Sequence, residues 1–251
     1  MLKRIMTVCF LLSAALWGKA QSVSEMVEEA KQLEKQMKES EAFEKDKDIL
    51  KIQPAELDAL NQASQLCSRI GNRQKSKDDK VSYFNMAKSY AQQALKVNPN
   101  NPDANLSMAI AMGRMALISG AKDKVAASKD VKKYAELAIK FNPSLAQAYH
   151  VLGKWNFEVA NLNAFERGAA KMLFGGLPDG SLQNAINNYE KCRQLDPGFL
   201  LNYYELARAY KENDQQDKAI EVLKKALTLR NVVYDDATIK MDCKKMLDDL
   251  Q

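Results

Sequence analysis

The sequence is poor in the residues that build metal and disulfide sites. Among its 251 residues there is one histidine, His150, and there are four cysteines. Cys67, Cys192 and Cys243 lie far apart, and Cys9 falls inside an N-terminal apolar run. A disulfide framework is therefore a poor interpretation, with one bridge as the upper limit, and the cysteines lack the spacing of a zinc site. We expect no metal site and no cofactor.

The sequence motifs of common enzyme classes are missing as well. There is no Gly-Lys-Ser/Thr phosphate loop, no Gly-x-Gly-x-x-Gly turn after a strand, and no Gly-x-Ser-x-Gly elbow. His150 and Glu158 are the best pair for a hydrolase, but no nucleophile is apparent near them in the sequence. The sequence therefore predicts a binding protein and not an enzyme.

The sequence also has no marked excess of positive or negative charge once the N-terminus is set aside. The whole chain has 37 basic and 32 acidic residues. Removing Lys3, Arg4 and Lys19 with the first 20 residues leaves 34 basic and 32 acidic residues, a formal charge of +2. This near balance of charge does not indicate a nucleic-acid-binding protein.

The N-terminus has the pattern of a secretory signal. Lys3 and Arg4 precede an apolar run from Ile5 to Trp17, and small residues follow up to Ala20. The run is shorter than the about 20 residues of a comfortable membrane span, so we expect cleavage near Ala20 and an exported, periplasmic or secreted protein. An uncleaved membrane anchor is the alternative.

Alternation of apolar and polar residues is scarce, whereas helical spacing of small residues recurs through the chain. Four segments carry small or apolar residues at i, i+4 and i+7: Ala87, Ala91, Ala94; Val131, Ala135, Ala138; Ala185, Tyr189, Cys192; and Ala219, Leu223, Ala226. In the first three segments a proline follows five residues later: Pro99, Pro143 and Pro197. Such phasing predicts an all-α array of about four stacked helical hairpins.

The same patterns divide the chain into segments. Residues 21–52 are dense in Glu and Lys and predict a charged amphipathic helix, either a leader helix lying on the first repeat or a dimerising coiled coil. Residues 53–232 form the array, and residues 233–251 form a final helix that caps it. The polar segments 71–80 and 119–129 are expected to be long loops within the array.

The last unit resembles the tetratricopeptide repeat, a helix–turn–helix unit of about 34 residues. Its first helix would bury Leu206, and the preceding unit would bury Leu152. The third unit resembles the regulator of microtubule dynamics family more specifically, through Ala148-Tyr149-His150-Val151-Leu152-Gly153-Lys154-Trp155, Phe165-Glu166-Arg167, Leu173-Phe174-Gly175 and Leu177-Pro178. The resemblance extends from about Val81 to Leu250 and implies a non-catalytic adaptor or tether. The predicted export makes this chain an exported, bacterial-type member, so the microtubule connection is not carried over.

The register predicts a ligand groove on the inner face of the array. A protein or peptide segment with acidic groups would meet His150, Lys154, Phe157, Tyr204, Arg208, Lys211, Leu106 and Ile110. In this hypothesis the lysines and the arginine supply charge, and the aromatic rings pack on the ligand. The alternative is that these residues form an ordinary solvated surface.

A second hypothesis concerns residues 161–181, which carry apolar side chains at helical spacing and interrupt the third unit. This inserted helix could close as a lid over an apolar ligand such as a lipid, with Leu106, Ile110 and Phe157 beneath it. The lid residues would be Phe165, Glu166, Arg167, Met172, Leu173, Phe174 and Leu177. The alternative is a helix that merely completes the core. A lipid or membrane surface is therefore kept as a second kind of partner, and the oligomeric state is open.

Overall fold

The structure is a computed structural model that describes residues 23–176 and 180–251. The predicted signal peptide and its cleavage point lie outside the described residues. A helix over residues 23–35 is followed by α2 (Glu39–Ile52), α3 (Leu57–Asn72), α4 (Lys77–Val97), α5 (Pro102–Ile118), α6 (Ala121–Phe141), α7 (Ala146–Ala160), α8 (Ala164–Phe174), α9 (Leu182–Leu195), α10 (Leu200–Glu212), α11 (Gln216–Thr228) and α12 (Asp236–Leu250).

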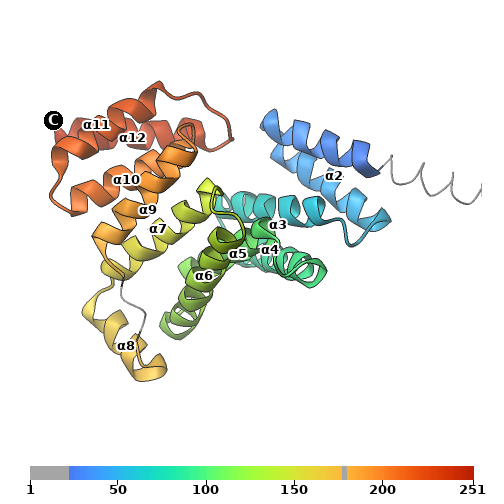
Figure 1. Cartoon of the computed structure of the whole chain (residues 1–251), viewed down its shortest axis with the longest axis horizontal. Coiled ribbons are helices and arrows are strands. Elements are labelled where there is room, and N and C mark those ends of the chain that lie inside the picture. Colours follow the sequence, from blue (N-terminus) through green and yellow to red (C-terminus); the bar gives the residue numbers. More distant parts are fainter. Residues whose placement is uncertain (1–22, 177–179) are drawn as a thin grey trace, which may run out of the picture.

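The helices pack as hairpins that stack in sequence order. The hairpins are α3 with α4, α5 with α6, α7 with α9, and α10 with α11, and each packs on the next through α4 and α5, α6 and α7, and α9 and α10. Figure 1 shows them following a curved path, with α12 lying on the last hairpin. The prediction of an all-α, tetratricopeptide-like array is confirmed.

The three phased prolines lie in matching turns between hairpins. The residue before each proline ends the preceding helix, and its side-chain oxygen accepts a backbone hydrogen bond of 3.0 Å from the residue two positions later: Asn98, Asn142 and Asp196. The proline carbonyl then accepts a hydrogen bond from a side chain six residues on: Asn105 at 3.0 Å, Tyr149 at 3.1 Å and Tyr203 at 3.0 Å. The turn therefore fixes where each new hairpin begins.

The small-residue stripes form the contact between paired helices. All twelve residues of the four stripes are buried, and most have no exposed surface. Gly153 is part of the same packing, because a Cβ atom there would lie 2.8 Å from ring carbons of Tyr189. Leu206 is fully buried, as expected. Leu152 is only half-buried, at the margin of the cluster around Trp155, so the expectation of full burial there is wrong.

The N-terminal region is a hairpin and not the single charged helix that was predicted. Met37 adopts a left-handed backbone, with φ of 61°, and the Lys38 N–H donates to the Leu33 carbonyl at 2.9 Å, which ends the first helix. The apolar stripe of that helix, including the fully buried Ala30, packs against α2 and α3. Ala30 is therefore covered within the chain, as a leader helix on the first repeat requires.

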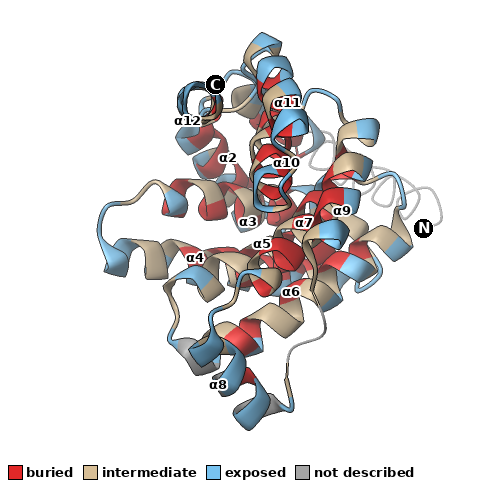
Figure 2. Cartoon of the chain, turned by 90° about the vertical axis from the view of Figure 1, so that its left-hand side faces the viewer, coloured by how far each residue is buried: buried red, intermediate tan, exposed pale blue. Residues whose placement is uncertain are grey.

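The two expected polar loops are mostly helix, so that prediction is wrong. Both α4 and α6 are 21 residues long and begin at Lys77 and Ala121. Ser76 starts α4 by accepting a hydrogen bond from the Asp79 N–H at 3.2 Å. The charged residues of these segments lie on outer turns, where Figure 2 shows mostly exposed and intermediate residues. The polar residues of these segments cover the outer turns of long helices, and a solvated helix surface has much the same composition as a loop.

Candidate functional site on the concave face

The first helices of the hairpins line the inner side of the curve. Helix α3 packs beside α5, α5 beside α7, and α7 beside α10. In Figure 1, α3 and α5 lie toward the middle of the molecule, and α7 and α10 follow to the left. We call this inner side the concave face, and most of the predicted groove residues belong to its helices.

Three predicted groove residues are not available to a ligand. Leu106 has no exposed surface, Phe157 is 5% exposed and His150 is 8% exposed. Leu106 packs with Ala138 and Ala148 from the neighbouring helices, so neighbouring hairpins approach closely enough to cover it. The prediction that these three side chains contact a ligand is wrong, because they belong to the contacts between hairpins.

His150 is a structural residue that joins three helices. Its Nδ1 lies 3.1 Å from Oδ1 of Asn202, while Nδ2 of Asn202 donates to the Tyr189 carbonyl at 2.8 Å. Because the amide oxygen can only accept, His150 donates from Nδ1. Burial lowers the pKa of His150 to about 4, so the ring is neutral near pH 7. This arrangement supports the stacking of α7 on α9 and α10.

Two of the three predicted cations, Lys154 and Arg208, are already paired. Lys154 Nζ lies 3.0 Å and 3.1 Å from the two carboxylate oxygens of Glu205, and 3.0 Å from Glu158. Arg208 donates to the same Glu205 at 2.9 Å. The Phe157 ring lies under both cations, 5.6 Å from the lysine and 4.8 Å from the arginine. This network joins α7 to α10 and stabilises their contact.

The remaining groove residues keep some access to solvent. Lys211 is exposed near the end of α10, and Ile110 and Tyr204 are half-buried. Burial raises the pKa of the Tyr204 hydroxyl, so this side chain stays neutral near pH 7. These three residues are the part of the predicted groove that a partner could reach.

An ionic contact that no sequence pattern predicts joins the two ends of the array. Arg73 donates to both carboxylate oxygens of Asp235 at 3.1 Å, and it also pairs with Glu39. Its guanidinium lies 4.7 Å from the Tyr234 ring centre, and Arg69 pairs with the same Glu39 at 2.8 Å. In Figure 1 the segment before α12 comes close to the N-terminal helices. The contact spans 162 residues of sequence, so no local pattern could reveal it.

Arg114 is the second residue that was missed. It lies on α5, and its Nη1 donates to Oδ1 of Asn72 at 3.1 Å. Asp235 and Glu205 lie near enough to favour its charged form, but burial outweighs them and lowers its pKa. Both acids are held by other cations, and within the described chain no carboxylate lies within ion-pair distance of Arg114. Arg114 therefore carries unused N–H donors while still reaching solvent.

The inserted helix does not cover the concave face. Helix α8 packs against α6, and Glu166 pairs with Lys124 of α6 at 2.7 Å. Arg167 donates to the carbonyls of Leu162 and Ala160 at 2.9 Å and 2.6 Å. The expected lid over Leu106 and Phe157 is therefore wrong.

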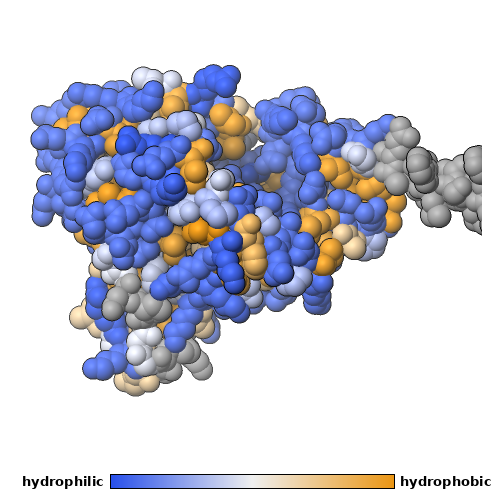
Figure 3. Space-filling model, viewed as in Figure 1, coloured by the Kyte–Doolittle hydropathy of each residue, from blue (hydrophilic) through white to orange (hydrophobic). Residues whose placement is uncertain are grey.

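Two large apolar side chains of α8 are exposed to solvent. Phe165 is 78% exposed and Met172 is 84% exposed. Leu173, Phe174 and Leu177 fall outside the part of the chain whose side chains the structure describes. Figure 3 shows a largely hydrophilic surface in this view, with hydrophobic residues in separate patches. The insertion thus presents apolar side chains to solvent.

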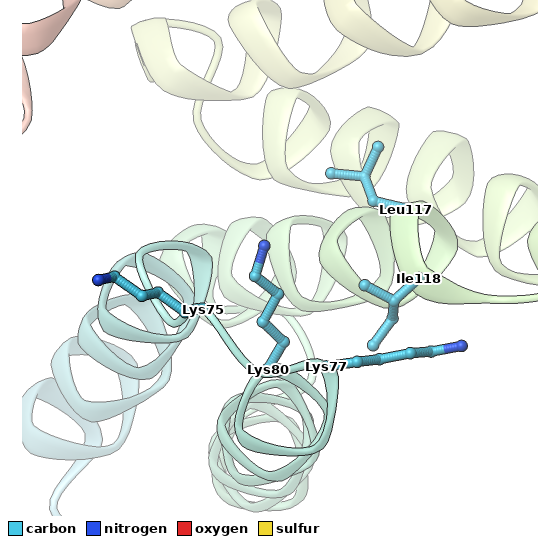
Figure 4. A pocket seen from close by; sticks show the side chains of 5 residues that line it. All are labelled: Lys75, Lys77, Lys80, Leu117 and Ile118. Carbon is cyan, nitrogen blue, oxygen red and sulfur yellow. The ribbon is translucent and has the colours of Figure 1, made fainter.

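One hollow lies outside the concave face. It has a volume of about 330 Å³ and is lined by Lys75, Lys77, Lys80, Leu117 and Ile118. Figure 4 shows Lys80 extending between the helices toward Leu117, and Ile118 directed toward Lys77. Within residues 23–176 and 180–251 there is no cluster of side chains suited to a metal ion. None of the helices in those two ranges is long and apolar enough to cross a membrane.

Comparison with solved structures agrees with the fold. A tetratricopeptide-repeat protein of Thermus thermophilus superposes with a TM-score of 0.64 at 14% sequence identity, covering 91% of this chain and 98% of that protein. At this identity the similarity establishes the fold alone.

Comparison with curated sequences identifies relatives. Regulator of microtubule dynamics protein 2 of Bos taurus is 28% identical over 169 residues, which cover 67% of this chain and 41% of that protein. Protein 3 of Xenopus laevis is 29% identical over 170 residues, which cover 67% of this chain and 37% of that protein. The chain therefore spans about two fifths of the length of these relatives. The model of the family Regulator of microtubule dynamics protein 1-3 matches residues 26–251, and the chain belongs to this family.

Proposed function

We propose that this chain is a non-enzymatic adaptor that binds a segment of a partner protein on its concave face. The tetratricopeptide-like fold supports this function, because stacked hairpins present an extended inner surface to a ligand. The single observation that carries the proposal is Arg114, a cation on that face with unused donors and no ion-pair partner among the described residues. A guanidinium in this state suits an incoming carboxylate.

The charge pattern around Arg114 supports an acidic partner segment. The acids that face it, Asp235 and Glu205, are already bound to Arg73, Lys154 and Arg208. A carboxylate from a partner would therefore not have to displace an existing ion pair. Ile110, Tyr204 and Lys211 would extend the contact along α5 and α10.

We further propose that the chain is exported and that the adaptor acts in the periplasm or after secretion. The observations behind this are the basic residues Lys3 and Arg4, the apolar run that follows, and the small residue Ala20. N-terminal sequencing of the protein isolated from its own cells should return a chain that begins near residue 21. An intact Met1 would overturn the cleavage.

Crosslinking in the native compartment, followed by mass spectrometry, tests the adaptor function and identifies the partner. Crosslinks should map to α3, α5, α7 and α10. With the partner in hand, Arg114→Gln should weaken binding about tenfold or more, as expected for the loss of hydrogen bonds to a charged group. Arg230→Gln, which removes the same charge from an exposed position near the end of α11, is the matched control and should bind normally.

Two outcomes would overturn the assignment of the groove. One is a set of crosslinks confined to the outer helices, and the other is full binding by Arg114→Gln. Lys154 and Arg208 are unsuitable for this test, because replacing either one leaves Glu205 short of a partner and disturbs the packing of α7 on α10.

A further inference from the structure

One edge of the array gathers the connections between the first and second helices of three hairpins. The hollow joins Lys75, Lys77 and Lys80, around the start of α4, to Leu117 and Ile118 at the end of α5. The chain then enters α6, whose Lys124 pairs with Glu166 at the start of α8. Figures 1 and 2 both show α8 standing out beyond α6. We call the surface formed by residues 75–80, 117–118 and 164–172 the loop edge.

The loop edge carries large apolar side chains that the fold leaves uncovered. Leu117 is 59% exposed, Phe165 is 78% exposed and Met172 is 84% exposed. Phe165 and Met172 are seven residues apart on α8 and so lie on the same side of that helix. The opposite side of α8 is fixed by the Glu166 ion pair and by the hydrogen bonds of Arg167 to two backbone carbonyls. The outward direction of the apolar side chains is therefore built into the attachment of α8.

Basic side chains belong to the same segments as these apolar residues. Lys75, Lys77 and Lys171 are exposed, and Lys80 reaches into the hollow. Within the described ranges these lysines form no ion pair, although Asp78 and Asp79 share the first turn of α4 and reduce the net charge. Exposed apolar side chains next to unpaired lysines complement a surface that is apolar below a layer of negative charge.

We propose that the loop edge docks on an anionic lipid surface, with Leu117, Phe165 and Met172 entering the interfacial layer and the lysines facing the headgroups. The exposed apolar side chains are few and are accompanied by lysines without ion pairs, which suits insertion between anionic lipids. A protein partner would need a broader continuous contact area. This inference does not depend on the concave adaptor function, because the loop edge and Arg114 use different residues.

Sedimentation of the full chain with vesicles tests the proposal. Vesicles of phosphatidylcholine with about 30% phosphatidylglycerol should bind the protein, because anionic headgroups attract basic side chains. Vesicles of pure phosphatidylcholine should bind it weakly. The edge variant Leu117→Ser, Phe165→Ser and Met172→Ser should lower the partition coefficient by about tenfold or more, because membrane affinity follows buried apolar area. The control variant Ile52→Ser, Val97→Ser and Met241→Ser, at other exposed apolar positions, should partition like the parent.

Hydrogen exchange separates the loop edge from other membrane contacts, including any made by the N-terminal apolar run. Addition of anionic vesicles should slow exchange of the α8 amides in the parent chain and not in the edge variant. The proposal is overturned if the parent chain does not bind anionic vesicles, if the edge variant binds as tightly as the parent, or if α8 exchanges at an unchanged rate. Equal partition coefficients for the edge variant and the control variant would also overturn it, because the membrane contact would then not depend on the loop edge.

Discussion

Asp46 makes the stability of this protein depend on pH in an unusual direction. The carboxyl group lies on α2 with no exposed surface, and neither oxygen has a hydrogen-bond partner within the described chain. Burial, with a smaller contribution from Glu34, raises its pKa from 3.8 to about 8. The folded protein therefore holds this proton near neutral pH, whereas the unfolded chain releases it above about pH 4.

The sign and size of the effect follow from linkage. Because the folded state binds the proton more tightly, the contribution of Asp46 to the free energy of unfolding falls as pH rises from about 4 to about 8 and then levels off. At about 1.4 kcal/mol for each pKa unit, Asp46 costs about 4 kcal/mol at pH 7 and less than half of that at pH 5. Such a cost is a large fraction of the stability of an ordinary domain.

Urea unfolding of the parent chain and of Asp46→Asn at several pH values measures this cost. The asparagine keeps the shape and cannot ionise, so its stabilising effect should grow from pH 5 to pH 8 by several kcal/mol. Asp249→Asn, at an exposed position of α12, controls for the change in net charge. A difference between parent and Asp46→Asn that is independent of pH would refute the reasoning, as would a destabilised Asp46→Asn at pH 7.

Three other perturbations test the packing. Burial lowers the pKa of His150 from 6.5 to about 4, so the contribution of His150 to stability should fall by about 3 kcal/mol as pH drops from 6.5 to 4, opposite in sign to that of Asp46. In a pH series of urea titrations, His150→Phe should therefore gain stability relative to the parent as pH falls through this range. Gly153→Ala should cost about 1–3 kcal/mol in thermal unfolding, because its Cβ would overlap an aromatic ring of α9, whereas Gly168→Ala, with open space around it, should not destabilise. Arg73→Met should cost about 3 kcal/mol, because it removes the cation bound to Asp235 and one of the two cations bound to the buried Glu39. An Arg73→Met chain as stable as the parent would show that the contact between the two ends contributes nothing to the free energy of unfolding.

The order of the hairpins could be predicted because stacking requires a local pattern. Close approach of two helices needs small residues such as Ala87 and Ala91 at helical spacing, and a restart of the chain needs a turn such as the one at Pro99. Both signals lie within one unit of sequence. The residues that carry the family resemblance also lie close together in the sequence. The family match begins at residue 26, before the start of that resemblance near Val81, and so includes the N-terminal hairpin.

The concave face could not be predicted to the same degree, because it depends on how neighbouring hairpins close on one another. The helical register places His150 and Phe157 on the inner side, but the next hairpin covers them. Arg114, by contrast, was not predicted from the sequence and is left accessible by the fold. Nothing near it in the sequence marks it, and its isolation follows only because Asp235 and Glu205 are bound by other residues once the chain is folded.

The insertion shows why the two proposed surfaces can be separated by mutation. A stacked array tolerates extra residues between the helices of one hairpin, because the stacking contacts lie along the helices and not at their connections. Helix α8 is attached through Glu166 and through backbone carbonyls near its start, so Phe165 and Met172 can change without touching the stripes that hold the hairpins together. Arg114 lies on a different helix and faces the inside of the curve. A variant of the loop edge should therefore keep its concave partner, and Arg114→Gln should keep its affinity for vesicles.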